Sequence, residues 1–245
     1  MQKGFFITGT DTGVGKTVIA GALIKVFRAY GIDTCGMKPI ETGCRRSGNF
    51  LYPSDGLFLT DLSGFAGDID AITPYRFETP AAPLVASERE GRGIEVNILM
   101  KAFNLISSRY QAVIVEGAGG LLVPIKKEYF MLDLARDLAL PLIVISRPSL
   151  GTINHTLLTV GYALKEGMEV SGIIVNFHEP LHGSVAEETN LETLKDISPV
   201  PLFGSFPYLE DLRGETLERA AFIHLDTKVL IKALHSKCRS SHTTK

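Results

Sequence analysis

The sequence predicts an α/β protein: a single domain with a three-layer, doubly wound, mostly parallel sheet. Short apolar runs rich in β-branched residues alternate with helical patterns along the 245 residues, which is the order expected of βαβ units. The hydrophobic content of 45% is enough to cover such a sheet on both faces, and the length fits one α/β domain. We expect this domain to span residues 1–236, followed by a short polar and basic tail over 237–245.

Five apolar runs are predicted to be strands. Two of them, 112–116 and 142–146, are apolar almost throughout, as expected of central strands covered on both faces. Both runs end in polar residues, and ligands of open parallel sheets bind beyond the carboxyl ends of the strands. The predicted strands are 5–8, 34–38, 112–116, 142–146 and 172–176.

Helical patterns fill most of the segments between these strands. Two segments lack regularity and are predicted to be long loops at the functional edge of the sheet. One is 42–53, rich in Gly, Arg, Ser and Asn; the other is 78–83, which contains two prolines and opens a short helix through Glu90. The predicted helices are 16–30, 54–65, 96–110, 131–138, 151–166, 187–196 and 226–236.

Composition excludes several classes of protein. A net charge of −2 and a pI near 6.3 give no concentrated basic surface for nucleic acid, and the one basic cluster is the terminal tail. Three cysteines without metal-ligand spacing argue against a disulfide framework and against structural zinc. No apolar run approaches the roughly 20 residues that span a bilayer, and no signal-peptide pattern opens the chain. We therefore expect a cytoplasmic protein without a membrane partner.

A phosphate-binding loop is predicted at residues 9–17, which read Gly-Thr-Asp-Thr-Gly-Val-Gly-Lys-Thr between a strand and a helix. The glycines let backbone N–H groups approach phosphate oxygens, and the next helix presents its positive N-terminal end. Lys16 is expected to reach the β- and γ-phosphates and Thr17 to hold Mg²⁺. The strict pattern has glycine where Thr10 stands, so the loop is a variant with Gly9 in its place. A glycine-rich turn without a ligand is the alternative, and the strand–loop–helix order disfavours it.

Lys38 ends a predicted strand at the same edge of the sheet. With Lys16 it could stabilise negative charge on a phosphoryl group and its acceptor; a solvated lysine is the alternative. Thr42 follows on the loop and could hydrogen-bond a substrate.

Two carboxylates could complete a magnesium site with Thr17. Asp55 lies in the first turn of a helix for which Ser54 is the predicted N-cap, so it either complements the helix dipole or binds metal. Glu116 ends a buried strand, where an ionised carboxylate needs a partner, and Mg²⁺ beside a triphosphate is one. Asn176 ends another strand and could read the edge of adenine, or simply form a turn.

Together these motifs resemble those of the dethiobiotin synthetases, ATP-dependent ligases of biotin biosynthesis with the P-loop NTPase fold. The displaced glycine is that family's own form of the loop. The motifs are Gly9-Thr10-Asp11-Thr12, Val14-Gly15-Lys16-Thr17, Lys38-Pro39, Ser54-Asp55, Glu116-Gly117-Ala118-Gly119-Gly120, Leu150-Gly151 with Ile153-Asn154-His155, and Asn176.

The resemblance implies a reaction. 7,8-Diaminopelargonic acid and CO₂ form a carbamate, which attacks the γ-phosphate of ATP to give a carbamic-phosphoric anhydride. The second amine then closes the ureido ring of dethiobiotin and releases phosphate. The family further implies Mg²⁺ as cofactor, a homodimer and a cytoplasmic location.

The resemblance also implies the site residues. Catalysis would fall to Lys16 and Lys38, and Mg²⁺ to Thr17, Asp55 and Glu116. The ATP site would comprise Gly13, Val14, Gly15, Lys16, Thr17, Val18, Asp55, Glu116, Gly117, Ala118 and Gly119, with Asn176, Pro207, Tyr208 and Leu209 around adenine. The diamine would contact Thr12 and Thr42, where the family commonly has serine at position 42. Its carboxylate would meet Gly151, Thr152, Ile153 and Asn154 of the neighbouring subunit.

Two other functional classes compete with this interpretation. Switch or partitioning ATPases of the same superfamily carry a signature lysine ahead of Gly-Gly-x-Gly-Lys-Thr, but here Asp11 takes the lysine position and Thr12 replaces the first glycine. Related amide-forming ligases usually carry a glutaminase domain, for which this chain has no room. Asp11 and Thr12 in the loop therefore argue against a switch ATPase and favour a dethiobiotin synthetase.

Overall fold

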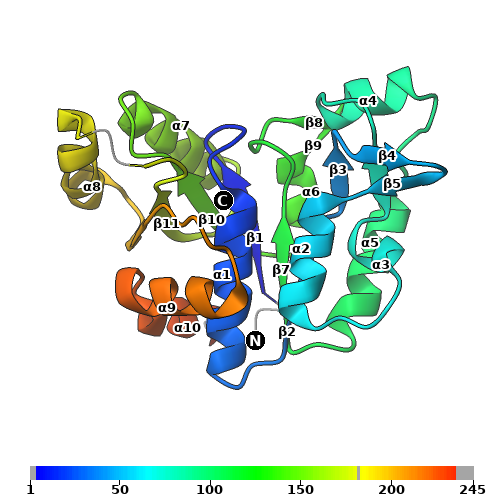
Figure 1. Ribbon diagram of the computed structural model, residues 1–245. Coiled ribbons are helices and arrows are strands. Elements are labelled where there is room, and N and C mark those ends of the chain that lie inside the picture. Colours follow the sequence, from blue (N-terminus) through cyan, green and yellow to red (C-terminus); the bar gives the residue numbers. More distant parts are fainter. Residues whose placement is uncertain (1–3, 181–182, 236–245) are drawn as a thin grey trace, which may run out of the picture.

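A six-stranded parallel sheet forms the centre of the molecule, with strand order β12-β11-β10-β1-β7-β2 (Figure 1). The computed structural model describes residues 4–180 and 183–235. Because β1 lies between β7 and β10, the loop that follows it emerges at the middle of the carboxyl edge, where such sheets bind ligands. The strands are β1 (Gly4–Gly9), β2 (Thr34–Met37), β7 (Ala112–Glu116), β10 (Leu142–Ser146), β11 (Val170–Asn176) and β12 (Leu202–Phe206).

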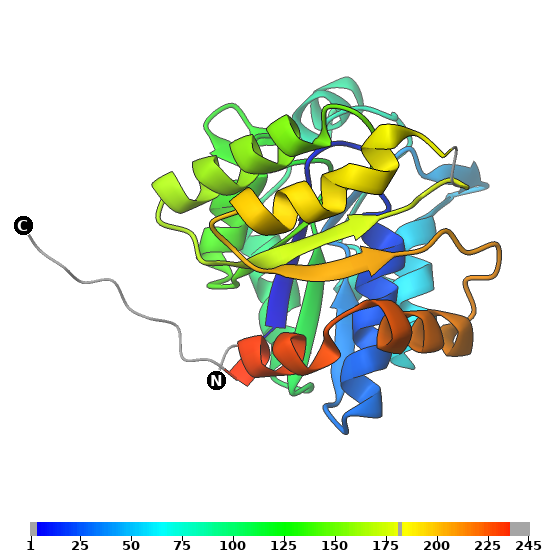
Figure 2. The ribbon, with the colours of Figure 1, turned by 90° about the vertical axis from the view of Figure 1, so that its left-hand side faces the viewer.

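Helices cover both faces of this sheet and make the molecule three layers thick (Figure 2). Successive side chains of a strand point to opposite faces, so Phe5 and Ile7 pack into one core and Phe6 into the other. Core residues of α1, α2, α9 and α10 lie on the Phe5 face, and those of α5, α6 and α7 on the Phe6 face. These helices are α1 (Lys16–Ala29), α2 (Ser54–Ser63), α5 (Val96–Ser107), α6 (Met131–Asp137), α7 (Thr152–Lys165), α9 (Gly214–His224) and α10 (Thr227–His235).

Three short strand pairs and three further helices complete the fold of the described residues. A short parallel pair and two short antiparallel pairs of strands lie outside the main sheet, and α8 packs beside α7. They are β3 (Ile40–Thr42) with β6 (Tyr75–Phe77), β4 (Arg45–Ser47) with β5 (Phe50–Tyr52), β8 (Pro124–Lys126) with β9 (Tyr129–Phe130), and the helices α3 (Ile69–Ile72), α4 (Pro83–Arg89) and α8 (Val185–Ile197).

The predicted fold class is confirmed, and the five predicted strands and seven predicted helices all occur, with ends that differ by at most three residues. Strand β12 and helix α9 were not predicted. Gly204 interrupts the apolar pattern of β12, and α9 buries only Leu217, Ala220 and Ala221, too few and too small for a clear apolar face. Both elements extend the sheet and its cover at the β12 edge.

Two local predictions were wrong. Residues 42–53 do not form an irregular loop, because β4 and β5 pair as an antiparallel hairpin there. Ser54 is not the N-cap of α2: the helix begins at Ser54, the N-cap is Pro53, and no side chain of the N-cap accepts a hydrogen bond.

Within residues 4–180 and 183–235, no helix is both long and apolar enough to cross a membrane. The predicted basic tail lies outside the described residues.

Candidate functional site

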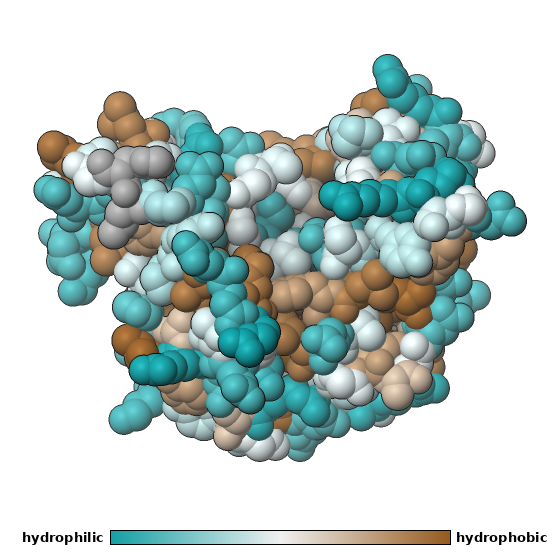
Figure 3. All heavy atoms as spheres, viewed as in Figure 1, coloured by the Kyte–Doolittle hydropathy of each residue, from teal (hydrophilic) through white to brown (hydrophobic). Residues whose placement is uncertain are grey.

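The carboxyl edge of the sheet is hollowed, and the hollow opens at the upper edge of the molecule between the α7 side and the β4–β5 side (Figure 3). A cavity of about 330 Å³ lies here, beside the loop after β1. Its lining combines the predicted phosphate loop, both predicted catalytic lysines and both predicted carboxylates. The lining residues are Thr12, Gly13, Gly15, Lys16, Thr17, Val18, Lys38, Glu41, Thr42, Asp55, Glu116, Ala118 and Gly119.

The phosphate loop depends on Gly15, which has φ +82° and forms the N-cap of α1. A Cβ at this position would lie 2.0 Å from Asn176 Nδ2. The same Nδ2 donates a hydrogen bond of 2.9 Å to the Val14 carbonyl, so the end of β11 holds the loop in place. Asn176 is buried and its amide nitrogen is already used by the loop, whereas the sequence pointed only to adenine or a turn. Lys16 Nζ donates to the Asp11 carbonyl at 3.1 Å, so its ammonium folds over the loop.

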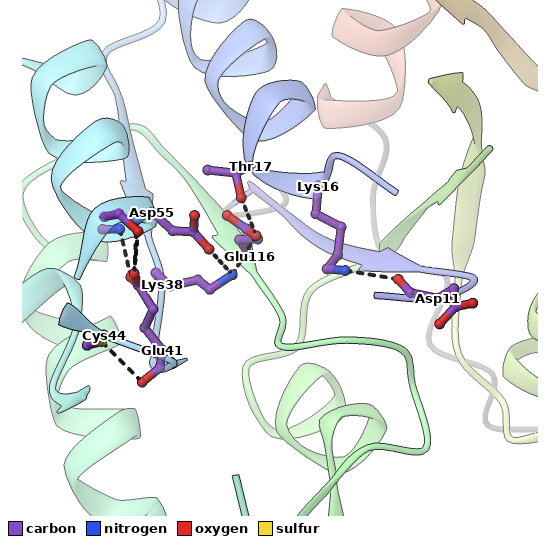
Figure 4. A network of polar contacts seen from close by, with 10 residues as sticks. Asp11, Lys16, Thr17, Lys38, Glu41, Cys44, Asp55 and Glu116 are labelled. Atoms are coloured by element: carbon purple, nitrogen blue, oxygen red, sulfur yellow. Dashed lines mark hydrogen bonds and ion pairs between the residues drawn. The ribbon is translucent and has the colours of Figure 1, made fainter. Parts of the chain in front are cut away.

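Four predicted residues, from α1, α2, β7 and the segment directly after β2, meet in one polar network (Figure 4). Lys38 Nζ lies 2.5 Å from Glu116 Oε1 and 2.9 Å from Asp55 Oδ2. Thr17 donates from Oγ1 to Glu116 Oε1 at 2.9 Å. Lys38, Glu116 and Lys16 are buried, whereas a third of the Asp55 side chain faces the cavity. The structure thus brings the predicted metal ligands together around the ammonium of Lys38.

Burial and neighbouring charges act differently on the two lysines. Burial, and then the like charge of Lys38, lower the pKa of Lys16 to about 8. Burial also opposes the charge of Lys38, but the Glu116 and Asp55 carboxylates outweigh it and raise the pKa of Lys38 above its ordinary value. Burial raises the pKa of Glu116, and the contact with Lys38 opposes that rise. Lys38 is therefore a fixed positive charge, and Lys16 is the titratable one.

The oxygen atoms of this network suit a hard divalent cation. Glu116 Oε2 is buried and has no hydrogen-bond partner among the described residues. Within the same residues no group of three or more His, Cys, Asp or Glu side chains could hold a metal. Two carboxylates and a hydroxyl fit Mg²⁺, which keeps water ligands and takes others from bound phosphates.

Glu41 belongs to this site but was not predicted. It is buried in β3, and Oε1 accepts hydrogen bonds from Ser54 Oγ at 3.2 Å and Asp55 N at 3.0 Å, while Oε2 accepts one from Gly56 N at 3.0 Å. Burial raises the pKa of Glu41, and the charge of Asp55 adds to the rise. The only signal in the sequence is one acidic residue among the uncharged Pro39, Ile40 and Thr42, which does not reveal its partners.

A second cavity, of about 430 Å³, includes two of the residues predicted around adenine. Pro207 and Tyr208 line it together with Phe177, Pro180, Ser205 and His224, which the sequence did not indicate. Leu209 packs against the core on the Phe5 face, and Asn176 is not in this lining.

The predicted diamine contacts divide between two places. Thr12 and Thr42 line the first cavity. Gly151, the N-cap of α7 with φ +91°, and Thr152, Ile153 and Asn154 in its first turn line neither the first nor the second cavity. A third cavity, of about 410 Å³, lies between the phosphate loop and α7, where Leu122, Leu158 and Tyr162 line it.

Solved structures share the fold at low identity. The MinC:MinD cell division protein complex of Aquifex aeolicus aligns with a TM-score of 0.55 and 15% identity, covering 99% of this chain and 100% of that chain. A ParA family ATPase from Chlorobium tepidum gives 0.53 and 16%, covering 96% and 100%. At this identity the likeness concerns the fold alone, so it does not favour a switch ATPase.

Sequence relatives are much closer. The model of the AAA domain family matches residues 3–216. The ATP-dependent dethiobiotin synthetase BioD of Thermodesulfovibrio yellowstonii is 42% identical over 238 residues, 94% of this chain and 99% of the relative. The protein of the same name from Bacillus velezensis is 38% identical over 92% of this chain and 95% of its own length, and that from Bacillus thuringiensis 38% over 99% and 97%. The chain therefore belongs to the family of ATP-dependent dethiobiotin synthetases.

Proposed function

We propose that the chain closes the ureido ring of dethiobiotin from 7,8-diaminopelargonic acid, CO₂ and ATP, and releases ADP and phosphate. The observation that carries this proposal is the placement of two lysines, Lys16 and Lys38, and two hydroxyls, Thr12 and Thr42, around one cavity beside the phosphate loop. The relatives named ATP-dependent dethiobiotin synthetase support the choice of substrates.

Nucleotide binding is assigned to the loop and its neighbours. The N–H groups of residues 13–18 would bind the phosphates at the start of α1, where a helix favours anions. After β7, Ala118 and Gly119 line the same cavity, whereas Gly117, which is also assigned to the nucleotide, is not in its lining. The second cavity, between Pro207, Tyr208 and Phe177, is assigned to adenine, because two aromatic rings and proline give a flat base apolar contacts.

Thr17, Asp55 and Glu116 would hold Mg²⁺, which would neutralise phosphate charge when bound. The free Oε2 of buried Glu116 supports this assignment. Mg²⁺ is the hard cation that such oxygen donors prefer.

Three steps account for the chemistry. One amine adds to CO₂ and loses a proton, so that a carbamate forms. A carbamate oxygen attacks the γ-phosphorus, and the bond to ADP breaks. The second amine then attacks the carbamoyl carbon and loses a proton, and phosphate leaves with the bonding electron pair. Lys16 and Lys38 would stabilise the negative charge on the transferred group, which is the largest contribution a site of this kind makes.

We further propose that the enzyme works in the cytoplasm as a homodimer. Leu158 is 63% exposed and Leu122 54% exposed beside the third cavity, an apolar surface that a second copy would cover. The start of α7 on that copy would supply N–H groups to the diamine carboxylate. Sedimentation at micromolar concentration tests the pairing, and a monomer would contradict it.

Mass spectrometry after incubation tests the reaction. We expect a dethiobiotin product only when diamine, bicarbonate, ATP and Mg²⁺ are all present, with one phosphate released per product. ATP cleavage that is indifferent to the diamine, with no product, would refute the ligase assignment.

Nucleotide affinity is expected to fall as the pH rises through about 8, the lowered pKa of Lys16. A bound phosphate favours protonated Lys16 and raises its pKa again, so binding takes up a proton near pH 8 and weakens above it. Calorimetry of ADP binding from pH 7 to 9.5, in buffers with different ionisation enthalpies, measures both effects. Constant affinity without proton uptake would contradict this prediction.

A further inference from the structure

We propose that Glu41 is a positioning residue: its buried carboxylate fixes the first turn of α2, and through that turn it holds the Asp55 carboxylate where the metal ligands meet. This inference rests on the proposed role of Asp55 as a metal ligand. It concerns a residue that itself makes no assigned contact with nucleotide, diamine or metal.

Helix α2 begins without a cap of its own. The first N–H groups of a helix have no partner inside it, and a polar N-cap side chain usually accepts one of them. The N-cap here is Pro53, which has no side-chain acceptor, although its carbonyl accepts from Leu57 N at 2.8 Å. Glu41, 14 residues before Asp55, supplies the acceptors instead, at 3.0 Å from both Asp55 N and Gly56 N.

The strength of this cap follows from its chemistry. A carboxylate that accepts backbone N–H groups at a helix N-terminus makes charge-assisted hydrogen bonds and also complements the helix dipole. Glu41 is only 4% exposed, so water does not compete for these contacts. Its own backbone is fixed by the pairing of β3 with β6, where Glu41 lies opposite Arg76. The cap therefore joins a fixed strand to the helix that carries Asp55.

Asp55 needs such support. Its side chain is 35% exposed, unlike that of Glu116, which is 1% exposed, so packing alone does not fix it. Its Oδ2 reaches Lys38 only because the first turn of α2 faces the ends of β2 and β7 (Figure 4). A shift of this turn would move one ligand and leave Thr17 and Glu116 in place.

The same turn is closely packed at Gly56, which leaves no room for a side chain. A Cβ on Gly56 would lie 2.0 Å from Thr73 Oγ1, a buried atom of a fully buried residue. Gly56→Ala therefore forces the turn and the buried Thr73 side chain apart without changing any charge. It offers a perturbation independent of Glu41→Gln, which keeps the size of the side chain but presents an NH₂ group to one of the two backbone donors.

The experiment compares ADP affinity with Mg²⁺ and with chelator, by calorimetry on the full chain, and takes the ratio of the two. Mutation of a residue that orients a metal ligand without binding the metal itself typically changes metal affinity by about 10–100-fold. We expect Glu41→Gln and Gly56→Ala each to reduce the ratio about tenfold, with affinity in chelator within about threefold of the unchanged chain. Ser63→Ala is the matched control, because it removes the acceptor of Gly36 N from the other end of α2, and it should leave the ratio unchanged.

The Asp55→Asn variant tests whether Glu41 changes the affinity ratio through Asp55. If Glu41 acts through Asp55, then Glu41→Gln added to Asp55→Asn lowers the ratio no further, whereas independent effects would multiply. Unchanged ratios in both Glu41→Gln and Gly56→Ala, equal loss in Ser63→Ala, or multiplied effects in the double variant would each overturn the inference. A ratio near one in the unchanged chain would instead overturn the metal assignment on which it rests.

Discussion

Gly15→Ala is expected to abolish measurable nucleotide binding. The new methyl group would lie 2.0 Å from Asn176 Nδ2, so it must expel the side chain that hydrogen-bonds the Val14 carbonyl. At φ +82° an alanine also costs about 1–2 kcal/mol of backbone strain. The strain and the clash both fall on the N-cap of α1, where the phosphates are expected. Calorimetry with ADP measures the loss.

Gly13→Ala is the matched control for this substitution. Gly13 has φ +75°, similar to Gly15, but no atom lies within 4 Å of a Cβ placed there. The two variants share the strain and differ in the clash, so Gly13→Ala should weaken binding by about tenfold, the equivalent of 1–2 kcal/mol, and not abolish it. Equal affinities in the two variants would show that Asn176 does not hold the loop.

Lys38→Ala is expected to lower turnover by about 10²–10³, the usual cost of removing one group that stabilises developing charge. The affinity for ADP should stay within a few-fold, because the charge of Lys38 matters chiefly when the phosphoryl group transfers. Steady-state rates with saturating diamine and bicarbonate, together with calorimetry, separate the two effects. Equal losses in turnover and affinity would place Lys38 in the ground-state nucleotide site.

The same substitution carries a cost in stability that must be measured beside it. Lys38 is the close partner of buried Glu116, and removal of one member of a buried ion pair costs about 3–5 kcal/mol. The melting temperature of Lys38→Ala is therefore measured as well, and the kinetic measurements are made well below that temperature. Lys25→Ala serves as the control. Lys25 lies on α1, with its Nζ 3.9 Å from Glu218 on α9, and its loss should change neither the turnover nor the stability.

Most of the residues that line the first cavity could be picked out from the sequence because their signals are local. The loop before α1 has its own spacing, Lys38 follows β2 and Glu116 ends β7, and both strands could be recognised in the sequence. The edge of a parallel sheet then brings such residues together, so knowing the strands was enough to place them near one another.

Glu41 could not be predicted in the same way. Its role depends on α2 starting at Ser54 beneath it, and the pattern around Ser54 suggested a helix that caps itself. The pairing of Asn176 with Val14 and the cavity lining of His224 likewise join residues far apart in the sequence. Such contacts arise from the tertiary packing of elements whose sequences carry no sign of one another.

The β4–β5 hairpin starts and ends at the same point in space, because Glu41 before it already contacts Ser54 and Asp55 after it. The hairpin residues 45–52 therefore form a side branch, and none of them takes part in the contacts that join Thr17, Lys38, Asp55 and Glu116. Since extra loop length costs little once the ends are joined, insertions and deletions should accumulate here during evolution. Residues 45–52 are thus free to diverge, although Thr42 before them and Asp55 after them both line the first cavity.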